Sequence, residues 1–480
     1  MTKMGALLRV KTLVISFLLL MIIVPKTGTA SEKSLNYEIS PSKVVLKLSY
    51  PEGLESSEPA YKVRHTTNPM KVIIDLSYSL PNVPAVISTK DVALSAIRTS
   101  RIDGGATTRI VLDFNYELPA PKAYLQDGQL IVEVDKIFMR ENLRSISYGV
   151  KYGHQRRAIA AGPLIINYLW IDIVDPEIEV KMVLAQDRVT GSERVSNMAK
   201  RSNALAAVNG AFFASDGRPL GLLAINGEFI SESYANRTAL GLGKNFAIID
   251  SVTLNGTVRV SNGESIAISG LNRPRLQDEL IIYTPAYGSS TRTNIYGIEI
   301  VLIDGVVTQI EQGGSAIPEN GIVLSGHGKA RDLLMQLQVG DQVQLDFELV
   351  PDWFSLGVTE IIGGGPRLVK DGKVHITGVE ERFQNDILNS RAPRTALGIR
   401  ADGSLLLVTV NGRNPGISVG MTLEELAELM IELGAVDAMN LDGGGSTTMV
   451  IRDMVLNIPS DGIERSVSNA IIVTTPETRR

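Results

Sequence analysis

The stretch Asn440-Leu-Asp-Gly-Gly-Gly-Ser-Thr-Thr-Met-Val450 decides how the rest of the chain is interpreted. Apolar residues on both sides predict two buried strands, and Asp442 begins the loop between them. Three consecutive glycines allow φ > 0 and let backbone N–H groups approach an anionic oxygen, such as that of a phosphate. Ser446, Thr447 and Thr448 add hydroxyl donors. The pattern fits a ligand-binding loop, and it also fits a plain hairpin turn, for which one or two glycines suffice.

The first 30 residues have the pattern of an export signal. Its positive segment contains Lys3, Arg9 and Lys11, and an apolar run from Leu13 to Val24 follows. The small residues Gly28-Thr-Ala30 form the expected cleavage site. We therefore expect a mature chain that starts at Ser31 and is secreted, or held in the cell envelope or outside the cell by non-covalent contacts. The apolar run is shorter than the ~20 residues that span a bilayer, and no later segment is long and apolar enough to do so.

Composition narrows the class of protein. The chain has 480 residues, 44 glycines, no cysteine and a formal net charge of −5. Without cysteine there are no disulfides or thiolate metal sites, so stability must come from core burial. The absence of a long basic segment argues against nucleic-acid binding. The length suggests two or three domains of ~150 residues each. We predict an α+β protein, with a β-rich mixed-sheet domain preceded by a small all-β sandwich.

The first domain, residues 31–138, shows short alternating strands separated by turn formers. Two strands share an apolar-Asp-apolar ending, Ile74-Asp-Leu76 and Leu112-Asp-Phe114, which suggests an internal duplication. Acids and histidines do not cluster here, so a binding or spacer role is favoured over catalysis. The order of Asn68-Pro69, the Ile-Asp-Leu strand and a second strand Arg109-Ile-Val-Leu-Asp113 resembles the AMIN domain of bacterial envelope proteins. That resemblance implies a two-sheet sandwich that localises its partner domain to the cell wall.

The second domain is expected over residues 144–480, after a basic connector at 136–162. Residues 246–353 read as a β-rich excursion that shapes a cleft. A short helix is expected near 193–201. The clearest helix covers 422–434, where Thr and Glu at the first and fourth positions form a capping box and glycine ends the helix.

Candidate site residues stand at strand ends and beside glycine-rich loops in this domain. They are Asn209 before Gly-Ala-Phe-Phe213, Glu360 before Gly363-Gly-Gly-Pro366, Arg394, Arg413 and Arg465, besides Asp442 and its loop. Arginine pairs with phosphate oxygens through two parallel hydrogen bonds, and glycosidic cleavage uses carboxylates. Together these groups fit a substrate that joins a sugar to a phosphate. Arginine–aspartate pairs also commonly bridge a fold, and Asn209 either caps its turn or contacts a sugar hydroxyl.

Other familiar sites are disfavoured. Gly416-Ile-Ser418-Val-Gly420 has the spacing of a hydrolase nucleophile, but no histidine follows it, since the last one is His375. The four histidines lack metal-ligand spacing, and neither glycine loop ends in the Gly-Lys-Ser/Thr of a nucleotide-binding loop. The cofactor is therefore left undetermined, and none is required.

Several short motifs follow one another in order: Asn209-Gly-Ala-Phe-Phe213; Gly363-Gly-Gly-Pro366; Arg394-Thr-Ala-Leu-Gly398; Asn411-Gly-Arg413 before Ser418-Val-Gly-Met-Thr422; Asn440-Leu-Asp-Gly-Gly-Gly-Ser-Thr-Thr448; and Arg465-Ser-Val-Ser-Asn469. This series, within residues 144–476, resembles the phosphodiester glycosidase family. The resemblance implies an α+β hydrolase that releases a sugar from a sugar-1-phosphodiester and leaves a phosphomonoester. The chain lacks the cysteine-rich modules of animal members, so the expected substrate is a phosphosugar or glycan of a wall polymer or exopolysaccharide.

Roles follow as a hypothesis from this resemblance and from the clustering of polar residues at strand ends. Arg394 and Arg413 hold the phosphate, helped by the backbone of Gly443, Gly444 and Gly445. Arg465 is either a third phosphate contact or a partner of Asp442.

The sugar side of the site completes the hypothesis. Asp442 is the leading catalytic carboxylate, while Asn209, Ser446 and Thr447 bind or orient the sugar. Glu360 is either the second acid or structural, because a phosphate is already a good leaving group.

Two alternatives stay open. One is a non-catalytic envelope protein that binds glycan and scaffolds other enzymes, although the retention of every polar motif position argues against it. The other is an enzyme that cleaves a plain glycosidic or phosphate-ester bond in the same cleft.

Overall fold

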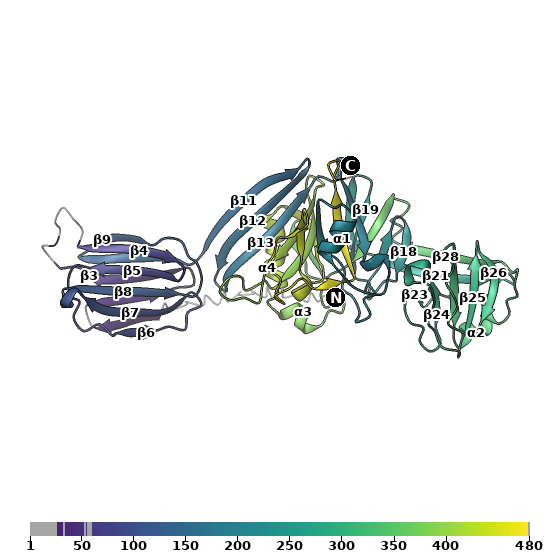
Figure 1. Ribbon diagram of the computed structural model, residues 1–480, viewed down its shortest axis with the longest axis horizontal. Coiled ribbons are helices and arrows are strands. Elements are labelled where there is room, and N and C mark those ends of the chain that lie inside the picture. Colours follow the sequence, from purple (N-terminus) through teal and green to yellow (C-terminus); the bar gives the residue numbers. More distant parts are fainter. Residues whose placement is uncertain (1–25, 32–33, 52–53, 55–59, 479–480) are drawn as a thin grey trace, which may run out of the picture. The chain divides into compact units, whose positions relative to one another are not determined.

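The computed structural model describes residues 26–31, 34–51, 54 and 60–478 (Figure 1). The chain forms two compact units: an N-terminal unit that extends to Asp113 and includes Pro119–Lys136, and a C-terminal unit of Phe114–Leu118 and the residues from Ile137 onward. Most of the expected export signal, residues 1–25, lies outside the described residues. In the described part of the chain, no helix is long and apolar enough to cross a membrane.

The N-terminal unit contains two five-stranded antiparallel sheets. Their strands, in spatial order, are β1 (Lys26–Ser31), β2 (Leu35–Ile39), β3 (Lys43–Ser49), β10 (Gln129–Asp135) and β9 (Lys122–Gln126), then β4 (Tyr61–Thr67), β5 (Met70–Leu76), β8 (Thr107–Phe114), β7 (Leu94–Ile102) and β6 (Val86–Ser88), with a 3-10 turn at Asp103–Gly105. Alternate residues of β3, β5 and β8 are buried. This confirms the expected all-β unit, while its resemblance to the AMIN domain stays a prediction. The expected cleavage site at residues 28–30 falls within β1.

The repeated apolar-Asp-apolar ending has a structural explanation. Asp75 accepts a hydrogen bond from Arg109 Nε at 2.6 Å, and Asp113 accepts one from Arg98 Nη2 at 2.9 Å. These hydrogen bonds to arginine hold the pKa of both carboxyls below the ordinary value. The two strands that carry them, β5 and β8, pair directly. The repeat therefore marks equivalent cross-strand ion pairs and no catalytic site.

An eight-stranded antiparallel sheet and a five-stranded one form the body of the C-terminal unit. The first contains β11 (Phe138–Ser147), β12 (Val150–Ile159), β13 (Gly162–Ile171), β33 (Leu405–Val410), β32 (Arg394–Arg400), β34 (Ala435–Asn440), β30 (Arg367–Lys370) and β31 (Lys373–Val374); the second contains β14 (Glu179–Leu184), β38 (Asn469–Thr474), β16 (Ala206–Asn209), β35 (Met449–Ile451) and β36 (Met454–Val455).

The remaining elements of the body are short. They are the pair β15 (Glu193–Arg194) and β37 (Ser466–Val467); the sheet β18 (Glu228–Ser231), β17 (Leu223–Ile225), β29 (Val358–Gly363), β19 (Thr238–Gly243) and β20 (Phe246–Ser251); the helices α1 (Val195–Arg201), α3 (Asn385–Asn389) and α4 (Leu423–Glu432); and 3-10 turns at Ala185–Asp187 and Gly444–Ser446. The expected β-rich α+β class is confirmed, with helices far fewer than strands.

The basic connector expected at residues 136–162 is wrong. These residues form most of β11 and β12, which pair with each other and with β13. In β12 the apolar side chains of Val150, Tyr152 and Ala158 are buried, while Lys151 and Arg156 are exposed. The charged residues are therefore exposed on both faces of a partly buried strand, so neither the composition nor a period-2 pattern indicated it.

The β-rich excursion is an insertion of residues 253–350 with its own hydrophobic core. It contains a three-stranded sheet, a five-stranded sheet, one helix and one 3-10 turn: β22 (Ser265–Ala267), β21 (Thr253–Val260) and β28 (Val343–Val350); β23 (Gly270–Leu271), β24 (Leu280–Tyr283), β27 (Gly321–Gly326), β25 (Ile298–Ile303) and β26 (Val306–Glu311); α2 (Lys329–Leu334); and Pro285–Tyr287. Figure 1 shows these strands together in teal to green. Ile281, Tyr283, Val301 and Val323 of the insertion also belong to the core that the main sheets share, so the insertion packs onto the body of the C-terminal unit.

The Asp442 loop joins the two main sheets of the body. It leaves the eight-stranded sheet at the end of β34 and enters the five-stranded sheet at β35. Buried residues of both sheets, among them Leu397, Met439, Val208 and Met449, belong to one hydrophobic core. The loop is thus anchored at both ends in packed structure, which fixes where Asp442 can lie.

Helix α4 packs against the strand that carries the loop. Leu426 and Met430 on its buried face belong to the same core as Ala438 of β34. At its N-terminus, Thr422 Oγ1 accepts a hydrogen bond from Glu425 N at 3.2 Å, and Glu425 Oε2 accepts one from Thr422 N at 3.1 Å. Arg391 donates to both oxygens of Glu425 at 2.5 and 2.6 Å. The capping box expected from the sequence is confirmed, and it also ties down the segment before β32.

The cap predicts a measurable stability change. We expect Thr422→Ala to lower the free energy of unfolding by about 1 kcal/mol, because an N-terminal backbone donor loses its partner, whereas Thr422→Ser retains most of it. Urea unfolding followed by tryptophan fluorescence measures this in the C-terminal unit, which holds both tryptophans of the chain, Trp170 and Trp353. Equal losses in the two variants would contradict a role for the hydroxyl.

Candidate active site

The backbone of the Asp442 loop is held on both sides by hydrogen bonds. Leu441 N donates to Thr395 O at 2.9 Å, and Gly444 N donates to Pro393 O at 2.9 Å. From the other sheet, Gly210 O accepts a bond from Asp442 N at 3.2 Å. Backbone hydrogen bonds therefore join the loop to β32 and its preceding residue and to the end of β16. These protein contacts hold its conformation.

Asn209 fastens the same loop through its side chain. The residue is fully buried, its Nδ2 donates to Asp442 O at 2.6 Å, and its Oδ1 accepts bonds from Thr395 Oγ1 at 2.7 Å and Thr448 N at 3.0 Å. These bonds leave one N–H of the amide for any further contact. The structure thus brings Asn209 to Asp442, where it positions the loop.

The Asp442 carboxyl is perturbed. Burial raises its pKa to about 6, against the opposing effects of the Ser446 hydroxyl, the Gly443 N–H and the positive charge of Arg465. A carboxyl with this pKa changes its charge close to neutral pH, which is the range that acid–base and nucleophilic groups of enzymes use.

Several buried polar atoms of the loop and of its neighbouring motif have no protein partner. In the described part of the chain, Thr447 Oγ1, Thr448 Oγ1 and Asn411 Nδ2 are buried and make no hydrogen bond. Buried donors are rarely left unpaired, because each lost bond costs about 1–3 kcal/mol. They are available to bound water or to the hydroxyls of a ligand. Sequence reasoning counted Thr448 among the hydroxyl donors of the loop but assigned no role to Asn411.

Arg413 is the free cation of the site. It is exposed, and it makes no hydrogen bond or ion pair with any other residue that the structure describes. A Cβ at Gly444 would lie only 3.1 Å from Arg413 Nη2, so the guanidinium rests on the glycine loop. Both Arg413 (φ 61°) and Gly444 (φ 62°) occupy the left-handed region. The loop and the cation therefore share one surface, which suits an anion.

Arg394 is buried beneath that surface, where it donates hydrogen bonds to backbone carbonyl groups. It is buried, its Nε donates to Met421 O at 3.0 Å, and its Nη2 donates to Ser390 O at 2.5 Å and Ile387 O at 3.2 Å. Burial lowers its pKa to about 10, and the nearby charge of Arg413 adds to this effect. The structure thus brings the two predicted arginines together, although most of the contacts of Arg394 are to carbonyl groups.

The glycines of the loop are needed for close approach. A Cβ at Gly443 would lie 2.8 Å from Pro393 O, and one at Gly445 would lie 2.1 Å from Arg465 Nη2. The Gly444 N–H is already bonded to Pro393 O, so the loop offers less of a backbone phosphate cradle than the sequence suggested.

Arg465 is neutralised by a neighbour. Its Nε and Nη2 donate to Asp461 Oδ2 at 2.9 and 2.6 Å. Its charge still acts on Asp442, since it lowers the pKa of that carboxyl. Arg465 therefore borders the site as half of an ion pair.

Glu360 lies apart from this cluster. Its Oε2 accepts a bond from Met182 N at 3.0 Å and its Oε1 accepts one from Asn226 N at 2.8 Å. Burial raises its pKa despite these bonds. It lines a separate cavity of about 330 Å³ with Lys181 and Thr359. Its contacts are those of a structural carboxylate, the second of the two roles considered for it.

Ser418 is bonded within the fold. Its Oγ donates to Asn411 O at 2.7 Å and accepts a bond from Ile165 N at 3.1 Å. The hydroxyl is therefore engaged with two backbone segments, which agrees with the rejection of a serine nucleophile.

Arg237 is a nearby residue that sequence reasoning missed. Its guanidinium lies 3.9 Å from the ring centroid of Phe383, 4.7 Å from that of Tyr234 and 5.7 Å from that of Phe212. The next residue, Thr238, accepts a bond from Gly364 N at 2.9 Å, and Gly365 N donates to Asn440 O at 2.8 Å. The second glycine motif thus connects this cation–aromatic cluster to the Asp442 loop. The Phe212 motif indicated an aromatic wall, but no local signal indicated the arginine.

Residues 296–474 match the family model of phosphodiester glycosidase. This segment holds Asp442 and its loop, Arg394, Arg413 and Arg465, whereas Asn209 lies before it. The bovine N-acetylglucosamine-1-phosphodiester alpha-N-acetylglucosaminidase is 31% identical over 137 residues, which are 24% of this chain and 25% of the bovine protein. An uncharacterized prophage-derived protein of Bacillus subtilis is 35% identical over 123 residues, 26% of this chain and 18% of that protein.

The alignments thus span a quarter or less of the length of these curated relatives. Likeness of fold extends much further. The crystal structure of a hypothetical protein from Synechocystis superposes with a TM-score of 0.62 at 22% identity, covering 90% of this chain and 78% of that one. The family model and the sequence relatives together show that residues 296–474, which carry Asp442 and its glycine loop, are similar to phosphodiester glycosidases.

Proposed function

We propose that this protein is an exported hydrolase that cleaves a sugar-1-phosphodiester into free sugar and a phosphomonoester. One observation carries the proposal: the Asp442 carboxyl, whose pKa burial raises to about 6, begins a glycine loop that also has buried, unpaired threonine hydroxyls and has the unpaired Arg413 guanidinium against Gly444. A carboxylate, hydroxyl donors and a cation on one loop match the groups that a sugar phosphate presents.

The bond changes are simple. Water supplies its hydroxyl to the anomeric carbon, the bond from that carbon to the bridging oxygen breaks, and the phosphate keeps the oxygen together with the electron pair. The second proton of the water passes to solvent or to the phosphate. Because a phosphate monoester leaves readily as an anion, protonation by a second carboxyl is unnecessary, in keeping with the distance of Glu360 from the cluster.

The residues of the site have three roles in this reaction: binding the phosphate, acting at the anomeric carbon and binding the sugar. Arg413 binds the phosphate and stabilises the charge that grows on it, while the buried charge of Arg394 adds to the local field. Ionised Asp442 stabilises positive charge at the anomeric carbon, or attacks or activates water there, as carboxylates do in glycosidases. Thr447 and Asn411 bind sugar hydroxyls with donors that the protein leaves unpaired, while the Ser446 hydroxyl supports ionised Asp442.

The substrate proposed is a phosphodiester-linked sugar of a cell wall or extracellular glycan. The export signal pattern and the separate N-terminal β unit support this location. N-acetylglucosamine is the first sugar to test, because the bovine relative is named for it. UDP-sugars and methyl-phospho-sugars provide defined substrates with the same scissile bond.

Replacement of the carboxylate tests the proposal. We expect Asp442→Asn to lower sugar release by about 10²–10⁴-fold, because the amide cannot act as a base, a nucleophile or a charged stabiliser. Free sugar and phosphomonoester are measured separately. Asp402→Asn is the matched control, since Asp402 also lies near an arginine and a serine but outside the loop. Full activity of Asp442→Asn would reject the assignment. Inactive wild-type protein that still binds purified wall would favour a glycan-binding scaffold.

The raised pKa of Asp442 predicts a pH dependence. The ionised form is the active one here, so kcat/KM should fall as the pH is lowered through about 6. A profile that is flat from pH 5 to 7, or that rises toward pH 5, would contradict an ionised Asp442.

The same pKa has a consequence for stability that does not depend on activity. Because the folded-state pKa lies above the ordinary aspartate value of 3.8, ionisation costs folding stability as the pH rises from about 4 to above 6. Asp442→Asn should therefore be more stable than wild type at pH 7, by about 1–3 kcal/mol, with the difference vanishing below pH 4. Urea unfolding at several pH values measures it.

Arg413 predicts a phosphate-specific effect. We expect Arg413→Ala to raise KM for the phosphodiester by roughly 10- to 100-fold, because one charge-assisted contact worth roughly 1.5–3 kcal/mol is lost. Arg413→Lys should recover part of it, and Arg259→Ala, an exposed arginine of the insertion, serves as the control. If Arg413→Ala left KM unchanged, the phosphate would have to bind elsewhere.

A further inference from the structure

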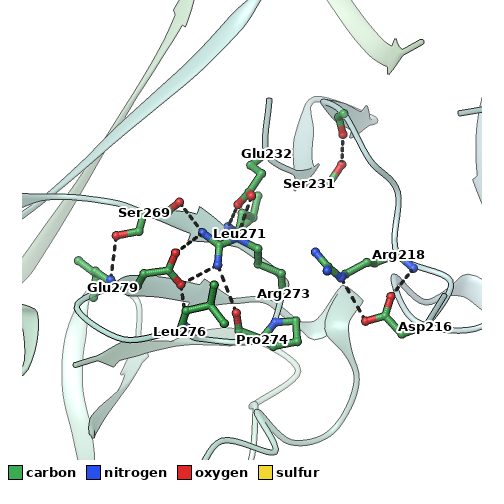
Figure 2. Close-up of polar contacts among 12 residues, drawn as sticks. Asp216, Arg218, Ser231, Glu232, Ser269, Leu271, Arg273, Pro274, Leu276 and Glu279 are labelled. Atoms are coloured by element: carbon green, nitrogen blue, oxygen red, sulfur yellow. Dashed lines mark hydrogen bonds and ion pairs between the residues drawn. The ribbon is translucent and has the colours of Figure 1, made fainter. Parts of the chain in front are cut away.

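A second cavity lies where residues of the insertion meet the body of the C-terminal unit. Its volume is about 150 Å³. The lining residues that matter here are Arg218, Leu220, Gly221, Glu232, Tyr234 and Leu271. Figure 2 shows the polar contacts around it. None of these residues belongs to the motifs that define the Asp442 site.

Glu232 presents a rigidly held carboxylate at this cavity. Its Oε1 accepts a bond from Arg273 Nε at 2.8 Å, and its Oε2 accepts one from Leu271 N at 2.9 Å. The remaining N–H groups of Arg273 donate hydrogen bonds to the Glu279 carboxylate, Ser269 O and Pro274 O. Arg273 thus fixes Glu232 and has no N–H left for a ligand, whereas each Glu232 oxygen can accept another bond.

Arg218 provides donors from the opposite side. Its Nε is bonded to Asp216 Oδ2 at 3.1 Å, and its two Nη atoms make no hydrogen bond to any residue in the described ranges. In Figure 2 the free end of this guanidinium faces the side on which Leu271 and Arg273 lie. The lining of the cavity therefore includes both a fixed acceptor and a free donor group.

The rest of the lining is apolar or aromatic. Leu220 and Leu271 contribute side chains, and Gly221 contributes none. Tyr234 adds a ring that is held by Arg237, whose guanidinium lies 4.7 Å from its centroid. An apolar surface flanked by a carboxylate and a guanidinium matches a sugar ring, which has hydroxyls at its edge and C–H groups on its faces.

Size and charge narrow the ligand. A protein cavity of about 150 Å³ is known to hold benzene, so this volume accommodates the ring of one pyranose, whose substituents extend beyond it. Its two arginines face three carboxylates, those of Asp216, Glu232 and Glu279, which leaves the site with net negative charge. An anion gains little from such a site and meets Glu232 directly, so a neutral ring is favoured over a phosphate.

Short contacts connect the cavity to the Asp442 loop. A Cβ at Gly221 would lie 3.5 Å from Gly363 Cα, and the Gly363 loop reaches Asn440 O through Gly365 N. On the other side, Leu220 N donates to Phe212 O at 2.7 Å, two residues after the Gly210 O that accepts from Asp442 N.

We propose that this cavity is a subsite for a neutral pyranose unit of the substrate, beside the sugar whose phosphodiester bond is cleaved. The inference rests on the proposed function. It adds that the substrate is longer than one sugar phosphate and that the insertion takes part in choosing it.

The test compares two substrates with the same scissile bond, a sugar-1-phosphate linked to methyl and one linked to a neutral disaccharide. We expect wild type to prefer the longer substrate at least tenfold in kcat/KM. Arg218→Ala and Tyr234→Ala should remove most of this preference through the KM of the longer substrate, and Arg259→Ala should retain it. Absence of a preference in wild type, or an intact preference in both cavity variants, would overturn the proposal.

A binding measurement separates this inference from the proposed function. If neither substrate is cleaved, the hydrolase proposal fails, and the subsite is then judged by ligand-observed NMR with neutral methyl glycosides of glucose, mannose and N-acetylglucosamine. Binding to wild type and to Asp442→Asn that drops at least fivefold in Arg218→Ala and Tyr234→Ala supports the subsite. No binding, or equal binding in all variants, rejects it.

Discussion

The side-chain amide of Asn209 is the interaction on which the candidate site depends. It bonds to residues of two segments that are far apart in the sequence: Thr395 on β32, and Asp442 and Thr448 at the two ends of the loop. The bonds to Thr395 and Thr448 are buried, and a satisfied buried polar network is rigid whereas a broken one is costly. Asn209 thus holds the loop between two sheets, and the carboxyl of Asp442 is placed by a residue outside its own motif.

The same logic explains why the motifs occur together. Asn469, the last residue of the Arg465 motif, accepts a bond from Ala211 N at 2.9 Å, and a Cβ at Gly210 would lie 2.0 Å from its Oδ1. Gly210 must therefore be glycine for Asn469 to reach the turn that follows Asn209. The glycine triplet after Asp442 obeys a similar constraint, because Pro393, Arg413 and Arg465 each approach a different one of its members. The missing side chains of these glycines allow neighbouring residues, as well as a ligand, to approach the loop closely.

Sequence patterns predicted what depends on local periodicity and chain chemistry. Helix α4 and its cap, the two strands around the Asp442 loop, the insertion and the β-rich class all follow from such patterns. The β11–β12 hairpin did not, because β11 is mostly exposed and burial along β12 does not alternate. The separation of Glu360 from Asp442 could not be predicted from such patterns either. Both acids lie beside glycine loops, and only the sheet topology shows which loops meet. The partners of Arg394 and the rings around Arg237 are likewise products of tertiary packing.

The arrangement of the arginines determines on which side of the glycine loop negative charge is favoured. Arg394 is buried among carbonyl groups and its pKa is lowered to about 10, in part by the neighbouring charge of Arg413. Two guanidinium groups close together without a carboxylate between them repel each other, and an anion bound at Arg413 would relieve that repulsion. Arg465 cannot play the same role, because Asp461 already neutralises it. Negative charge is therefore favoured on the Arg413 side of the glycine loop, while the unpaired hydroxyls and Asp442 are left for the uncharged sugar. A phosphate and a sugar joined by one bond would place that bond at Asp442.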